Sequence, residues 1–119
     1  MSNPLAPSWL AEPENANTLD LNIWPKTAKR DRDGELSIGG VSVSELTAQF
    51  GTPLYVIDEV QFKEQATRVR EAFEKAAESI GSKAKVYYAS KALLCTEVAS
   101  WIAELGMNID VASGGELSA

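Results

Sequence analysis

Histidine is absent from this sequence of 119 residues, and cysteine occurs only once, as Cys95. Without histidine, the chain has neither histidine-based acid–base chemistry nor histidine metal ligands, and one cysteine alone does not make a zinc site. A single cysteine also excludes an internal disulfide, which agrees with a reducing compartment. We therefore expect no metal site and a cytoplasmic location.

Basic residues are in the minority. Lysine and arginine number 11 against 17 aspartates and glutamates, which gives a net charge of -6. The chain has no basic stripe, so we expect no nucleic-acid partner. No stretch approaches the roughly 20 apolar residues of a membrane span, so we expect no membrane partner. Apolar residues still make up 45% of the chain, enough for most of it to fold around a core.

The N-terminal part differs in pattern from the rest. Residues 1–33 are polar and hold four of the five prolines, which predicts an extended lead-in. Two short runs, 35–38 and 41–43, flank Gly39-Gly40 and predict a β-hairpin with a tight turn. We assign residues 34–50 to this hairpin and to a short helix, which we expect Ser44 to cap and Gly51 to end.

From residue 51 onward, strand and helix patterns alternate. Asp58 is the expected N-cap of the best-supported helix, with Gln61 as its partner in a capping box. Alternating strands and helices indicate an α/β fold with a parallel sheet, either an open sheet or the first part of a (β/α)8 barrel. The strands are expected at 54–57, 85–89 and 108–112, and the helices at about 59–80, about 94–105 and from 113 onward.

Lys91 has an unusual setting. It is the only basic residue from Val86 to Ala119, and it follows an apolar strand and precedes another apolar run. A lone ammonium is costly to desolvate there, whereas a lysine that forms an imine with an aldehyde cofactor meets this constraint. The alternative is a lysine whose stem lies on apolar surface while its amine reaches water.

Three segments resemble motifs of the fold-type III pyridoxal-phosphate (PLP) dependent decarboxylases, and they occur in the family's order. Residues 88–92 (YASKA) resemble the Y-A-x-K segment of these enzymes. Residues 51–58 (GTPLYVID) and 110–117 (DVASGGEL) are similar to two segments of the members that act on diaminopimelate.

The resemblance implies a particular fold. Residues 51–119 would form about three βα units of a PLP-binding, alanine racemase-like (β/α)8 barrel. The hairpin before them would belong to a separate β-domain or to its junction with the barrel. The family is usually a homodimer with active sites at the subunit interface. We expect this chain to be an incomplete N-terminal portion of such an enzyme and inactive by itself.

The resemblance also implies a reaction and a site. The cofactor would be PLP and the substrate a small amino acid, with meso-2,6-diaminopimelate decarboxylated to L-lysine and CO2. Lys91 would be the catalytic residue that holds PLP. Asp110 would face the amine of Lys91, or only cap its strand. Ala89 would leave room for the cofactor ring, or only pack in its strand.

Several alternatives stay open. Within the same fold, the substrate class could be that of arginine or ornithine decarboxylases or of alanine racemase. A non-catalytic PLP-binding carrier protein is a second class, although such carriers lack the β-domain that the hairpin suggests. A small phosphate-binding module using Gly114-Gly115 is a third, but we expect that segment to be a turn.

Overall fold

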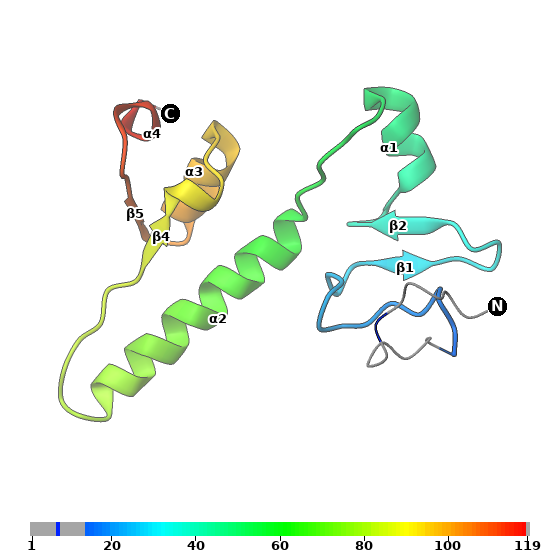
Figure 1. Ribbon diagram of the computed structural model, residues 1–119. Helices are drawn as coiled ribbons and strands as arrows, with labels where there is room; N and C mark the ends of the chain where they lie inside the picture. Colours follow the sequence, from blue (N-terminus) through cyan, green and yellow to red (C-terminus); the bar gives the residue numbers. More distant parts are fainter. Residues whose placement is uncertain (1–6, 8–13, 119) are drawn as a thin grey trace.

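The computed structural model describes residue 7 and residues 14–118, so most of the first part of the predicted lead-in lies outside the described residues. The three-stranded sheet lies beyond the start of a long helix, and the two-stranded sheet lies alongside that helix (Figure 1). The elements, in chain order, are β1 (Lys29–Arg30), β2 (Leu36–Ile38), β3 (Val41–Ser42), α1 (Val43–Phe50), α2 (Glu59–Glu78), β4 (Tyr87–Ala89), the 3-10 helix η1 (Ser90–Ala92), α3 (Thr96–Glu104), β5 (Asn108–Asp110) and α4 (Gly114–Leu117).

The predicted hairpin is confirmed, with β2 and β3 antiparallel and Ile38 paired with Val41. The lead-in is not extended throughout, because it ends in β1, which pairs with β2. A strand of two residues is too short for an alternating pattern to reveal it. The helix cap was predicted two residues too late: Ser42, not Ser44, accepts the N–H of Glu45 at 3.1 Å.

The predicted strand at 54–57 is wrong for this structure. The segment is extended but unpaired, and the side chain of Tyr55 is 95% exposed. An apolar, β-branched run forms a strand only when it pairs with the edge of another strand. Among the described residues, the parallel sheet that the segment was expected to join contains only β4 and β5. The first predicted βα unit therefore has its helix without its strand.

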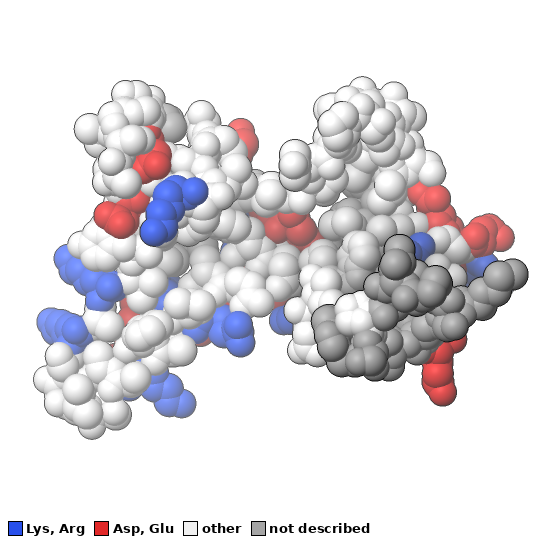
Figure 2. All heavy atoms as spheres, viewed as in Figure 1, with Lys and Arg blue, Asp and Glu red and all other residues white. Residues whose placement is uncertain are grey.

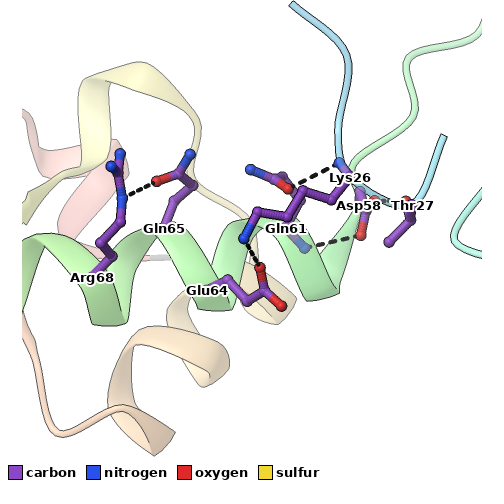
Figure 3. A network of polar contacts seen from close by, with 7 residues as sticks. All are labelled: Lys26, Thr27, Asp58, Gln61, Glu64, Gln65 and Arg68. Carbon is purple, nitrogen blue, oxygen red and sulfur yellow. Dashed lines mark hydrogen bonds and ion pairs between the residues drawn. The ribbon is translucent and has the colours of Figure 1, made fainter. Parts of the chain in front are cut away.

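The start of α2 is tied to the segment that precedes β1 (Figure 3). Asp58 caps the helix as expected, accepting the N–H of Gln61 at 3.0 Å, and it also accepts the hydroxyl of Thr27. The reciprocal half of the capping box is absent, because the Gln61 side chain accepts the Lys26 N–H at 3.2 Å. The amine of Lys26 lies 2.9 Å from Glu64. This polar network joins the antiparallel sheet to α2.

The second sheet has the predicted parallel pairing, since β4 lies beside β5 and α3 connects them. The α3 helix contributes the two buried apolar side chains of the described residues, Val98 and Ile102. Phe62 of α2 packs edge-on against Tyr88 of β4, with ring centroids 5.5 Å apart, and lies 5.6 Å from Trp101. These contacts position α2 against the β4–α3–β5 unit.

The arrangement is open. Its radius of gyration is 19.1 Å, against about 13.5 Å for a compact chain of this length. Phe73, in the second half of α2, and Ile80, just after its end, are 60% and 80% exposed, so large apolar side chains at this end of the helix face solvent. On the face drawn in Figure 2, cationic and anionic side chains form separate small groups among uncharged surface. In the part of the chain described, no helix is long and apolar enough to cross a bilayer.

Candidate active site

Lys91 lies where the sequence predicts it, immediately after a parallel strand. Strand β4 ends at Ala89, and Lys91 is the central residue of η1, which follows at once. Its side chain is exposed, and it forms no ion pair with any other residue that the structure describes. The expectation of a desolvated amine is therefore wrong for this structure. Its neighbours Ala92 and Leu93 are exposed as well, so no apolar surface of the described residues covers this turn.

Ala89 and Asp110 are paired at the end of the sheet. They are register partners in the parallel β4–β5 ladder, and each is the last residue of its strand. The structure thus brings all three predicted site residues to the carboxyl edge of the sheet, the edge at which active sites of parallel α/β folds lie. Asp110 is exposed, while Ala89 is half-buried.

Ala89 also borders an apolar hollow of about 490 Å³ between α2 and β4, which includes Phe62 and Tyr88 in its lining. Neither Lys91 nor Asp110 lines this hollow. Ala89 therefore has open space beside it on the side of α2, and its role at the cofactor stays a prediction.

A hydrogen-bonded cluster that the sequence interpretation missed adjoins Lys91. Ser90 is the buried polar residue of the described chain, with 2% of its surface exposed. Its hydroxyl lies 2.7 Å from the carbonyl oxygen of Asp110 and 2.8 Å from Oε2 of Glu116, so it can donate to either. Glu116 also accepts the N–H of Ala112 at 2.6 Å. These hydrogen bonds lower the pKa of Glu116, and the bond from the Ala112 N–H has the largest effect. The carboxylate is therefore ionised at neutral pH.

A signal for Glu116 was present in the sequence. Ser113 and Glu116 have the S-x-x-E spacing of a capping box, and Ser113 does cap α4 by accepting the Glu116 N–H at 3.2 Å. The Glu116 carboxylate, however, reaches Ala112 and Ser90. Its contact with Ser90 joins residues 26 positions apart, which spacing within one helix cannot reveal.

Ser113-Gly114-Gly115, which we expected to be a turn, instead begins helix α4, with Ser113 as the N-cap residue. Helix α4 has four residues, and the Glu116 carboxylate already occupies the Ala112 amide before it. Among the described residues, no group of three or more His, Cys, Asp and Glu side chains could hold a metal ion. The chemistry at this edge is therefore that of a primary amine with carboxylates nearby.

Comparison with known families indicates the class of protein that this chain resembles. Residues 66–119, which include β4, η1 and β5, match the family described as pyridoxal-dependent decarboxylase, pyridoxal binding domain. The match covers the segments around Lys91 and Asp110, where two of the three motifs had indicated a resemblance to PLP-dependent decarboxylases.

Within that class, the chain is similar to curated diaminopimelate decarboxylases. It is 44% identical to the protein from Mycobacterium bovis over 97 residues, which are 82% of this chain and 20% of that relative. The relative from Synechocystis is 41% identical over 98% of this chain and 24% of its own length. The one from Staphylococcus aureus is 40% identical over 76% of this chain and 21% of its own length. The chain thus spans about a fifth of the length of the curated relatives that it matches.

The residues at the sheet edge fit PLP in one respect that the structure itself tests. An aldehyde cofactor needs a primary amine that is accessible and not committed to an ion pair, and Lys91 meets both conditions among the described residues. Asp110 provides a carboxylate at the same edge, on the neighbouring strand.

Proposed function

We propose that this chain is part of a PLP-dependent enzyme that decarboxylates meso-2,6-diaminopimelate to L-lysine and CO2, with Lys91 as the residue that attaches the cofactor. The observation that carries the proposal is the position of Lys91 on η1, directly after β4 and beside the paired residues Ala89 and Asp110. The names of the curated relatives support the choice of substrate.

Each of the three residues at the sheet edge has a role under this proposal. PLP, when bound, supplies an electron sink for the bond to the departing carboxylate. Lys91 holds the cofactor through its amine. When PLP is bound, Asp110, at the end of the adjacent strand, would stabilise a proton on Nζ of Lys91 or orient the side chain. Ala89 has no side chain beyond Cβ, so it leaves space for a planar ring beside the strand.

The proposal extends to the fold. We assign residues 51–119 to the first three βα units of a (β/α)8 barrel, in which the extended segment 54–57 becomes the strand beside β4. The apolar character of Val56 and Ile57, both exposed here, supports this assignment. The β2–β3 hairpin is assigned to a separate β-domain. A homodimer and a cytoplasmic location remain predictions.

The test compares two lysines in the full-length protein. With PLP present, the wild type should release CO2 from meso-diaminopimelate and much less from ornithine or arginine. Lys91→Ala should abolish turnover. Lys83→Ala, which removes another exposed lysine just before β4, should retain it.

The other outcomes are equally informative. Full activity of Lys91→Ala would refute the assignment of the residue, and a preference for ornithine or arginine would refute that of the substrate. PLP binding at Lys91 without any turnover would indicate a carrier protein.

A further inference from the structure

Lys91 has no interaction of its own that fixes its side chain, since it is exposed and without an ion pair among residues 14–118. Its position therefore depends on the backbone of η1. That helix is a single turn, and Ala89, its N-cap residue, offers no side-chain hydrogen bond. Something other than an ordinary cap has to hold η1 against the sheet.

Ser90 makes that connection. Regular pairing of β4 with β5 stops at Ala89 and Asp110. One residue further on, the buried Ser90 hydroxyl contacts the carbonyl oxygen of Asp110 at 2.7 Å and so extends the link between the two strands by a side chain. The same hydroxyl lies 2.8 Å from Glu116. A hydroxyl has one proton, so it donates to one of these oxygens at a time.

Glu116 extends the connection to the segment after β5. Its carboxylate accepts from Ser90 and from the Ala112 N–H, and its own N–H donates to Ser113. Hydrogen bonds to an ionised carboxylate are stronger than those between neutral groups. The end of β4, the loop after β5 and the start of α4 are thus held by one side chain.

The far end of η1 has a separate attachment. The Tyr88 hydroxyl donates to the carbonyl oxygen of Leu93 at 2.7 Å, and Leu93 is the residue that ends η1. Burial raises the pKa of Tyr88, so the hydroxyl keeps the proton that it donates. The three-residue turn that bears Lys91 is therefore fixed on both sides.

From this geometry we infer that Ser90 and Glu116 are positioning residues for Lys91, which hold η1 so that the amine is presented to the cofactor aldehyde. The inference rests on the proposed function and adds to it two residues that contact neither substrate nor cofactor. Misplacement of a reacting group by about 1 Å can slow a reaction by roughly a hundredfold. Loss of this connection should therefore slow the attachment of PLP more than it weakens the binding of PLP.

The experiment measures attachment without turnover. Full-length protein is mixed with PLP at several concentrations, reduced with borohydride after timed intervals, and digested, and the labelled fraction of Lys91 is measured by mass spectrometry. Ser90→Ala and Glu116→Ala should each lower the maximal labelling rate about tenfold to a hundredfold. The PLP concentration at half-maximal rate should stay near that of the wild type. Ser90→Thr, which keeps the hydroxyl, should restore most of the rate.

Ser113→Ala is the matched control, because it removes the cap of α4 and leaves the contact between Ser90 and Glu116 in place. It should label like the wild type. If Ser113→Ala is as slow as Glu116→Ala, or if Ser90→Ala and Glu116→Ala label at the wild-type rate, the positioning role is wrong. If the wild type itself is not labelled at Lys91, the proposed function fails instead.

Discussion

The cap of α2 offers a direct test of how the two halves of the chain are connected. The Asp58 carboxylate accepts the Gln61 N–H at 3.0 Å and the hydroxyl of Thr27, so one side chain both starts the helix and binds the segment before β1 (Figure 3). Replacing Asp58 by alanine removes both bonds. The same Thr27 hydroxyl also accepts the N–H of Gly39 at 3.1 Å, so the turn of the hairpin depends on it as well.

The magnitude follows from the two lost bonds. Loss of an N-cap costs about 0.5–2 kcal/mol. Loss of a part-buried hydrogen bond costs about 1 kcal/mol more. A total of about 1.5–3 kcal/mol corresponds to local opening that is roughly tenfold to a hundredfold more frequent, since each 1.4 kcal/mol is a factor of ten.

Amide hydrogen exchange of the full-length protein measures this opening. The peptide that covers residues 59–66 should exchange about tenfold to a hundredfold faster in Asp58→Ala. Asp58→Asn keeps one oxygen for the Gln61 N–H, so it should retain the cap and lose only the bond from Thr27, and its exchange rate should fall between those of the wild type and Asp58→Ala. The reasoning is refuted if Asp58→Ala exchanges like the wild type, or if Asp58→Asn exchanges as fast as Asp58→Ala.

Two further predictions concern the β4–α3–β5 unit. Ile102 is completely buried, so Ile102→Ala should lower the free energy of unfolding in urea by about 2–5 kcal/mol and Ile102→Val by about 0.5–1.5 kcal/mol. Equal losses for the two variants would contradict tight packing around this side chain. Hydrogen bonds lower the pKa of Glu116 in the folded protein below its value near 4.5 in the unfolded chain. The ionised carboxylate therefore stabilises the folded protein fully above pH 4.5, and this stabilisation is lost as the pH falls through the pKa of the folded state. The difference in thermal stability between wild type and Glu116→Gln should therefore shrink as the pH is lowered below 4.5, and a difference that grows in acid would contradict the assigned bonds.

The sequence predicted the elements that depend on local pattern. The long helix α2 repeats apolar residues at three- and four-residue steps, and Asp58 caps it as expected. The hairpin around Gly39-Gly40 needs positive φ at both glycines, 61° and 87°, which local sequence also signals. Such features are set by residues close together in the chain, so a single sequence contains them.

What the sequence could not supply depends on distant partners. The apolar run 54–57 has the composition of a buried strand, but strand formation requires an edge to pair with, and the residues that the structure describes place none beside it. Gln61 has the spacing for a capping box, yet the Lys26 N–H, 35 residues away in the chain, binds its side chain. The same holds for the candidate site. Lys91 could be predicted from its motif and from the lack of other basic residues around it in the sequence, whereas the contact of Ser90 with Glu116 forms only when β4 and β5 pair.

The attachment of PLP to Lys91 is tested most directly by identifying the labelled residue. Full-length protein treated with PLP, reduced with borohydride and mapped by mass spectrometry should carry the cofactor mass on the peptide that contains Lys91. The exposed Lys83 and Lys85 should stay unmodified at one equivalent of PLP. Modification spread evenly over the lysines, or full incorporation of PLP in Lys91→Ala, would contradict the account.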